Sequence, residues 1–256
     1  MADEVVRYEQ RGAAGWITLA SPATRNALST QLVAELGAKL SAALDDPAVR
    51  AVVLTGEGPA FCAGADLKNR GAMGATDKGN PFVGILRQMR HGPKPVIVAV
   101  NGQTFGGGVG LVAAADIAIA VDTAVFSFSE VRIGAIPAMI SVVVLPKLGE
   151  HQMMRLFLTG ERFDAVRAHG YGLLHHVVAP GALESAVQEE VEAIAKGGPN
   201  AIREAKQLVR MVAQLPEDEA FRFAEQKIAA IFASEEAAEG MAAFAQKRPP
   251  KWTTGV

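Results

Sequence analysis

Short apolar runs that lead into glycine-containing turns alternate with helical patterns over the first half of the chain. The run Ala51–Leu54 precedes the turn Phe61–Asp66, and the run Val96–Val100 precedes the turn Phe105–Gly108. Strands that alternate with helices favour an α/β fold over an all-α or an all-β fold. Because the short strands come in pairs between helices, we predict a spiral of repeated turns rather than a doubly wound sheet.

The N-terminal segment predicts a β-hairpin that leads into a capped helix. Val5–Tyr8 and Trp16–Leu19 have strand character and flank a segment of Gly and Ala, which is typical of a hairpin. Ser29 is a favoured residue type for a helix N-cap, and the residues that follow it are apolar at helical spacing. The sequence Asp45-Asp46-Pro47 ends this helix.

Helical patterns dominate the chain after Pro137, and His176–Val178 is the one strand candidate in this part. The helices that we predict here span residues 138–148, 151–158, 163–169, 183–195, 201–212, 220–232 and 235–246. The sequence Gly197-Gly198-Pro199 interrupts the helical pattern. We therefore divide the chain into a core of residues 1–198 and a helical C-terminal region of residues 199–256.

The charge balance gives no reason to expect nucleic acid or a membrane as a partner. The 256 residues include 25 basic and 27 acidic side chains, a formal net charge of −2, which offers no attraction to polyanions. No apolar run reaches the roughly 18–20 residues that a membrane-spanning helix needs, and the first residues lack the pattern of a secretory signal. We expect a cytoplasmic protein.

Several kinds of functional site can be set aside. The single cysteine, Cys62, excludes an intramolecular disulfide and a cysteine-based zinc site, and its apolar neighbours indicate a small buried side chain rather than a nucleophile. No two of the five histidines have the spacing of metal ligands on one helix face, so we predict no metal site. Leu111 stands where a dinucleotide-binding turn that begins at Gly106 needs a glycine.

Short motifs follow one another in order along nearly the whole chain. They are Asn26-Ala27-Leu28, Ala51–Gly56, Phe61–Asp66, Lys94–Ile97, Val100–Gly102, Phe105–Gly108, Ser129–Gly134 and Phe244–Arg248. In this order they resemble the motifs of the enoyl-CoA hydratase/isomerase (crotonase) superfamily. The resemblance implies a crotonase-like spiral of repeated ββα units with a helical C-terminal region. It also implies assembly through that region into a homotrimer or a pair of trimers.

The resemblance implies a site for thioester chemistry. The two oxyanion-hole donors of the family are backbone amides, which by motif match fall on Ala65 and Gly107, and Glu130 matches a catalytic glutamate. Fixed N–H donors stabilise the negative charge that develops on a thioester oxygen. The apolar neighbours of Glu130 predict burial and therefore a raised pKa. The alternative reading of Glu130 is a surface glutamate paired with Arg132.

Coenzyme A is expected only as part of the substrate, with no covalently bound cofactor. Motif match implies contacts to it from the first motif, from the glycine turns and from the C-terminus. The implied residues are Arg25, Ala27, Ala63, Asp66, Leu67, Lys68, Gly108 and Lys247, the last reaching the ligand of a neighbouring subunit. Asp66 can instead cap the turn that follows it. Ile136–Ser141 resembles bacterial members that act on branched or modified enoyl-CoAs, and Gly110, Pro137 and Ala138 are expected in the substrate pocket.

One position departs from the family pattern. The second family glutamate falls three residues beyond Gly107, where this chain has Gly110. Asp116 does not replace it, because six helical positions further place it on another face. The site therefore has one carboxylate. We expect hydration of a 2-enoyl-CoA first. The alternatives are a delta3,delta2-enoyl-CoA isomerase that uses Glu130 alone and an acyl-CoA-binding protein without turnover.

Overall fold

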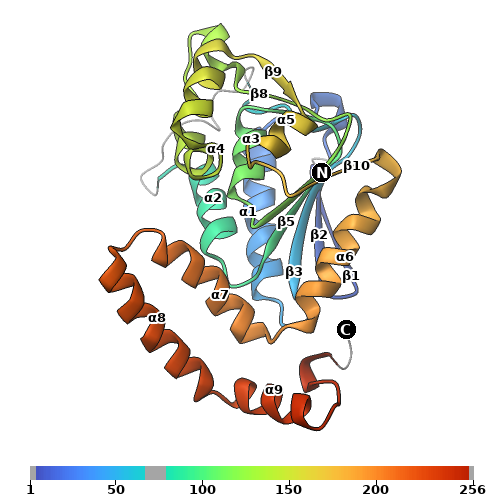
Figure 1. The fold of residues 1–256 in the computed structure, drawn as a ribbon. Helices are drawn as coiled ribbons and strands as arrows, with labels where there is room; N and C mark the ends of the chain where they lie inside the picture. Colours follow the sequence, from blue (N-terminus) through green and yellow to red (C-terminus); the bar gives the residue numbers. More distant parts are fainter. Residues whose placement is uncertain (1–3, 67–78, 254–256) are drawn as a thin grey trace.

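A computed structural model describes residues 4–66 and 79–253 and shows the predicted α/β spiral (Figure 1). The predicted contacts at Leu67 and Lys68 lie outside the described residues. The larger sheet has the order β1-β2-β3-β5-β7-β10, and the smaller sheet has the order β4-β6-β8-β9. The strands of the larger sheet are β1 (Val6–Arg11), β2 (Ala14–Leu19), β3 (Ala51–Gly56), β5 (Val96–Val100), β7 (Ile117–Val121) and β10 (His176–Val178). Those of the smaller sheet are β4 (Ala60–Cys62), β6 (Gln103–Phe105), β8 (Val125–Ser127) and β9 (Arg162–Asp164).

Each turn of the spiral contributes one strand to each sheet and then a helix. The three turns are β3-β4-α2, β5-β6-α3 and β7-β8-α4, and within each sheet their strands run parallel. The helices are α2 (Pro81–His91), α3 (Gly107–Ala114) and α4 (Ala138–Thr159), the last preceded by the 3₁₀ helix η3 (Ser129–Ile133). Parallel strands that are buried on both faces carry continuous apolar runs, which explains the fully buried sequence of β5.

Helices cover both faces of the larger sheet (Figure 1). The first helix, α1 (Thr30–Asp45), packs with α2 on one face, and the hydroxyl of Ser29 caps it by accepting the N–H of Leu32 at 3.2 Å, as predicted. On the other face α6 (Leu183–Lys196) buries Val187 and Val191 against a second apolar cluster that includes Trp16, Val53 and Ile97. None of the described helices is both long enough and apolar enough to span a membrane.

The structure corrects two predictions about local structure and confirms a third. Residues 61 and 105 were assigned to turns, but they lie in the three-residue strands β4 and β6. The helix predicted for residues 163–169 starts later than expected, because residues 162–164 form the strand β9 and the helix α5 (Ala165–Gly170) follows it. In β9, Phe163 pairs with Phe126 of β8, and the two rings stack with their centroids 5.6 Å apart. The predicted break between the helices 138–148 and 151–158 is confirmed, because Gly149 has a non-helical φ of 69° within the element α4. Strands of three residues are too short for a periodic pattern, so pairing across the sheet decides them.

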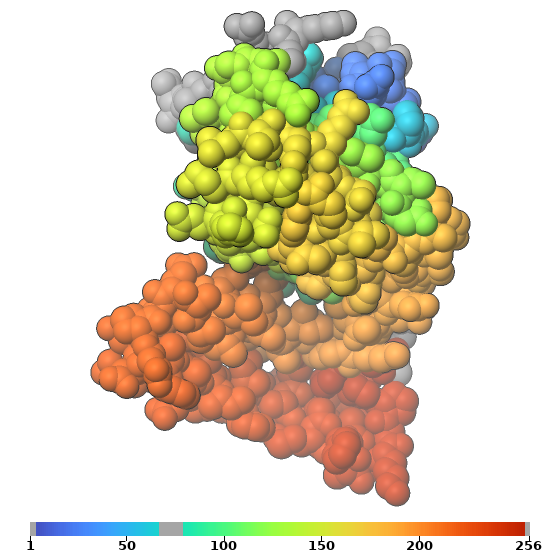
Figure 2. Space-filling view, turned by 45° about the horizontal axis from the view of Figure 1, so that its top comes forward, coloured from blue at the N-terminus to red at the C-terminus, as the bar shows by residue number. Residues whose placement is uncertain are grey.

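The C-terminal helices α7 (Pro199–Val212), α8 (Glu217–Phe232) and α9 (Glu235–Ala245) form an arm. In Figure 2 this arm, coloured orange to red, stands off the core as a second lobe. Neither α7 nor α8 contains a buried residue. The side chain of Lys206 ties the arm to the core by donating to the carbonyl oxygens of Met89 and Lys94, each at 2.8 Å.

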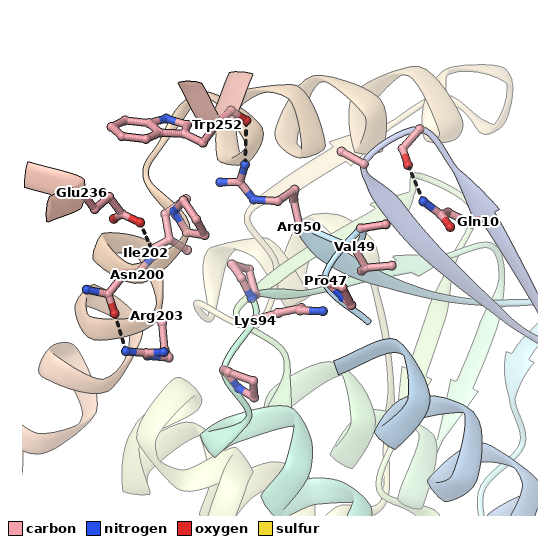
Figure 3. A pocket seen from close by; sticks show the side chains of 16 residues that line it. Gln10, Pro47, Val49, Arg50, Lys94, Asn200, Ile202, Arg203, Glu236 and Trp252 are labelled. Carbon is pink, nitrogen blue, oxygen red and sulfur yellow. Dashed lines mark hydrogen bonds between the residues drawn. The ribbon is translucent and has the colours of Figure 1, made fainter. Parts of the chain in front are cut away.

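A cavity of about 650 Å³ lies where the arm meets the core (Figure 3). Its charged side chains already have partners. Arg50 donates to the carbonyl oxygens of Gly197 (2.5 Å) and Trp252 (3.3 Å), and Glu236 accepts the backbone N–H groups of Asn200 (2.9 Å) and Ala201 (2.8 Å). These bonds hold the joint between core and arm together, and we assign the cavity no chemistry.

Candidate active site

A second cavity, of about 520 Å³, lies where the glycine turns of the first two spiral units meet η3 and the start of α4. The residues that line it include Ala65, Gly107 and Glu130, which the sequence analysis singled out for catalysis. Its walls are mostly apolar. Leu28 and Phe82 come from the first half of the spiral, and the stretch 133–140 comes from the segment after Glu130.

The two glycine turns touch each other directly. The segment that contains Gly64 is held in place because Leu28 N–H donates to the carbonyl of Gly64 (2.8 Å) and Ala63 N–H donates to that of Arg25 (2.9 Å). Gly64 has φ +85°, and a methyl group added there would lie 2.7 Å from the carbonyl oxygen of Phe105 and 3.4 Å from the amide nitrogen of Gly107. Only glycine allows this approach of backbone to backbone.

The amides of Ala65 and Gly107 are available for a ligand. Among the described residues, neither N–H group donates a hydrogen bond. Gly107 is the first residue of α3, where an amide has no acceptor within the helix and the helix dipole is positive. Both residues line the cavity, so an anionic or strongly polarised oxygen is the kind of group that this part of the site suits.

Glu130 lies in η3, directly beside the second glycine turn. A methyl group added at Gly106 would lie 2.8 Å from Oε1 of Glu130, and the other carboxylate oxygen, Oε2, is buried without a partner in the described part of the chain. Burial raises the pKa of the Glu130 carboxyl above its ordinary value. The alternative reading fails, because the Arg132 guanidinium donates to the carbonyl of Thr159 (3.4 Å) instead of pairing with Glu130, whose buried Oε2 has no partner in the described part of the chain.

The structure does not bring Gly110 to the surface of the cavity. Gly110 is buried, and a methyl group added there would lie 2.3 Å from Cγ2 of Ile140, which itself lines the cavity. Asp116 is also elsewhere, in ion pairs with Lys206 (2.8 Å) and Arg210 (2.7 Å) on α7. Of the described residues that line the cavity, Asp66 and Glu130 are the ones with ionisable side chains.

The other predicted residues divide into those at the cavity and those away from it. Ala63, Asp66, Pro137 and Ala138 line it. Arg25 and Ala27 lie in the segment that pairs with residues 63–65, and the Arg25 side chain is exposed. Gly108 is instead buried against Cys62, since a methyl group added at Gly108 would lie 2.6 Å from the Cys62 carbonyl oxygen. Lys247 follows α9 on the arm and does not line this cavity.

The described part of the chain contains neither a reactive thiol nor a cluster of metal ligands. Cys62 is fully buried, and burial raises the pKa of its thiol to about 12, so it has no nucleophilic thiolate at neutral pH. Within residues 4–66 and 79–253, no three His, Cys, Asp or Glu side chains gather as metal ligands would.

The sequence analysis named only part of the apolar wall, since it singled out the stretch 136–141 but assigned only Pro137 and Ala138 of that stretch to the pocket. The additional lining side chains are Val33, Phe82, Ile133, Ile136, Met139 and Ile140. The apolar residues that follow Glu130 were a signal that could have indicated Ile133, Ile136 and Met139. Nothing local in the sequence indicated Val33 or Phe82, because helical periodicity does not distinguish a residue that faces a cavity from one that faces the core.

The buried carboxylate has a consequence for stability that can be measured. Because the pKa of Glu130 is raised in the folded state, the folded protein holds this proton more tightly than the unfolded chain does. Stability is therefore lost as pH rises from the ordinary glutamate pKa of about 4.3 through the raised folded value, and the loss persists above it. We expect Glu130→Gln to raise the Tm at pH 7 and to leave it nearly unchanged near pH 4. Thermal unfolding at both pH values checks this, and a variant less stable than the parent at pH 7 contradicts it.

Nearly the whole chain matches known proteins. The model of the family described as enoyl-CoA hydratase/isomerase matches residues 9–255. Carnitinyl-CoA dehydratase of Citrobacter koseri is 34% identical over 258 residues, covering 97% of this chain and 98% of its own. The crystal structure of an enoyl-CoA hydratase from Shewanella pealeana has a TM-score of 0.91 at 30% identity, and covers 97% of this chain and 96% of its own. That of an enoyl-CoA hydratase/isomerase from Marinobacter aquaeolei has a TM-score of 0.89 at 36% identity, and covers 98% of this chain and 100% of its own.

Proposed function

The chain belongs to the enoyl-CoA hydratase/isomerase family, and on that premise we propose that it adds water reversibly to the double bond of a 2-enoyl-CoA thioester. One observation carries the proposal. The partly buried carboxylate of Glu130, with one oxygen unpartnered, lines the same apolar cavity as the amides of Ala65 and Gly107. Proton transfer beside a thioester carbonyl requires these two elements, a base and a pair of donors for the carbonyl oxygen.

In the proposed reaction the thioester oxygen accepts hydrogen bonds from the N–H groups of Ala65 and Gly107. The Glu130 carboxylate takes a proton from a water molecule while the water oxygen forms a bond to C3. The electrons of the C2–C3 double bond move toward the thioester oxygen, and the two amides stabilise the enolate. Glu130 then returns the proton to C2, so that the carboxylate is regenerated and one water has been added.

Coenzyme A enters this proposal as part of the substrate. The exposed side chain of Arg25 lies on the segment that pairs with residues 63–65, beside the cavity, and would meet a phosphate of the coenzyme. Ala27, Ala63 and Asp66 belong to the same proposed contact region, as do Leu67 and Lys68 outside the described residues. Lys247 would take part only when contributed by a second copy of the chain, because it lies on the arm.

Isomerisation of a 3-enoyl-CoA is a second candidate, and the single catalytic carboxylate favours it. One base can remove a proton from C2 and return it to C4, with a conjugated dienolate as the intermediate, whose oxygen would accept hydrogen bonds from the same two amides. This reaction needs no bound water. Hydration remains our first proposal because relatives across the whole chain carry hydratase or dehydratase names.

Isotope labelling separates the candidates. The purified protein would be given a 2-enoyl-CoA and a 3-enoyl-CoA in ¹⁸O-labelled water, and the products would be separated by chromatography, which distinguishes the two double-bond isomers, and their masses measured by mass spectrometry. Hydration adds one labelled oxygen to the 2-enoyl substrate. An isomerase converts the 3-enoyl substrate to the 2-enoyl product without gain of oxygen. Tight binding of both thioesters without any conversion overturns both activities and identifies a binding protein.

We further propose that the arm mediates self-association into a trimer or a pair of trimers. Its helices expose large apolar side chains, among them Phe221 (63% exposed) and Phe232 (60%), and such patches mark association surfaces. Light scattering is expected to give the mass of three or six chains. Phe221→Asp with Phe232→Asp should reduce this mass, whereas Val166→Asp, an equally exposed apolar position on α5 (68%), should not. A monomeric parent protein contradicts the proposal.

A further inference from the structure

Gly110 and Ile140 interlock across the contact between α3 and α4. A methyl group added at Gly110 would lie 2.3 Å from Cγ2 and 2.9 Å from Cβ of Ile140, which are distances that real side chains do not adopt. The β-branched side chain of Ile140 thus occupies the space into which any side chain at residue 110 would have to grow. Ile140 is itself 3% exposed and lines the wall of the catalytic cavity.

Displacing either Gly110 or Ile140 from this contact would cost free energy. Gly110 lies within α3, where its N–H donates to the carbonyl of Gly106 at 3.2 Å. Gly106 is held in turn because its N–H donates to the backbone carbonyl oxygen of Ser127 at 3.0 Å. Gly106 also lies against the Glu130 carboxylate. On the other side, Ile140 is in the first turn of α4, and a β-branched side chain in a helix has one strongly preferred rotamer.

We infer that Ile140 is a specificity-determining residue that keeps the catalytic chemistry of this cavity on Glu130 alone. Its hydrocarbon surface stands between Gly110 and the cavity, so the wall there offers no hydrogen bond to a water molecule and no room for a second carboxylate. In a hydration reaction, Glu130 then has to both remove the proton from water and deliver the proton to C2. This inference rests on the function proposed above.

A thermodynamic cycle tests the steric part without any assay of activity. Gly110→Ala, Ile140→Gly and the double variant would be compared by thermal unfolding. Overpacking predicts that Gly110→Ala lowers the Tm by about 2–10 °C and that the same change costs far less in the Ile140→Gly background, which lacks both the Cγ2 and the Cβ atoms that the added methyl group meets. The control is Gly84→Ala, a glycine inside α2 with no atom within 4 Å of the added methyl group, which should not lower the Tm. Strictly additive effects of the two substitutions overturn the inference.

A pH–rate profile tests the catalytic part. For hydration by the parent enzyme, the pH dependence of kcat/KM should show the ionisation of a single catalytic carboxylate. Gly110→Glu alone should fail to fold or unfold at a much lower temperature, whereas Gly110→Glu combined with Ile140→Gly should fold and show a second ionisation in the profile. A stably folded Gly110→Glu variant, or an unchanged profile in the combined variant, overturns the inference. A parent protein that hydrates no enoyl-CoA overturns the proposed function, and the unfolding cycle still decides whether Ile140 excludes a side chain at residue 110.

Discussion

Glu130→Gln is expected to lower kcat for hydration of a 2-enoyl-CoA by about 10²–10⁴-fold, the usual contribution of a positioned acid or base. The amide has nearly the shape of the carboxylate, so it should fit the same cavity, but it can neither take a proton from water nor return one to C2. The affinity for a saturated acyl-CoA should change little, because the proposed coenzyme contacts and the two backbone amides are untouched.

The matched control for this prediction is Glu150→Gln, which removes the charge of an exposed glutamate on α4. It should leave kcat unchanged. Steady-state kinetics on both variants, together with calorimetric titration of an acyl-CoA, separates loss of chemistry from loss of binding. If Glu130→Gln keeps more than a tenth of the parent kcat, Glu130 is not the acid and base of this site.

Gly64→Ala is expected to lower kcat by about 10²–10³-fold, the cost of losing one oxyanion donor. The added methyl group would lie 2.7 Å from the carbonyl oxygen of Phe105, so the turn that carries Gly107 must shift. Backbone donors cannot be deleted by changing a side chain, and this collision is the most direct way to displace one of them. Because the effect falls on the transition state, kcat should decrease more than the affinity for substrate.

The control for backbone strain is Gly12→Ala in the β1–β2 turn. Gly12 also has a positive φ (+54°), but no atom lies within 4 Å of the added methyl group. Both variants carry the conformational strain of a left-handed residue, and only Gly64→Ala carries the collision. Kinetics and thermal unfolding of the pair distinguish these effects. An equal loss of kcat in both variants would mean that general destabilisation, and not a displaced amide, is the cause.

The raised pKa of Glu130 connects activity with stability. A carboxyl group that is partly removed from water is a better acid and base near neutral pH, but its ionised form lowers the stability of the folded state. A more stable and inactive Glu130→Gln variant would therefore follow from one physical cause, the desolvation of this carboxylate.

The longer helices and strands were well predicted from the sequence. The hairpin, the capped helix α1, and the strands β3 and β5 each have enough residues for a periodicity of two or of about 3.6, or for a continuous apolar run. The glycines that allow close backbone approach were also visible, because no other residue combines a positive φ with the absence of Cβ. The strands β4, β6 and β9 were not predicted, since three residues give little pattern, although the equally short β10 was predicted from its residues His176–Val178.

By itself, the sequence determined which groups could carry thioester chemistry: two turns with bare backbone, one glutamate with apolar neighbours, and no carboxylate at residue 110. Only the tertiary structure decided that Ile140, thirty positions further along the chain, fills the space above Gly110, and that Asp116 pairs with the arm instead. The physical reason is that chemical character and backbone freedom are local properties of a residue. Steric exclusion depends on how closely α3 and α4 pack, and that distance exists only in the folded chain.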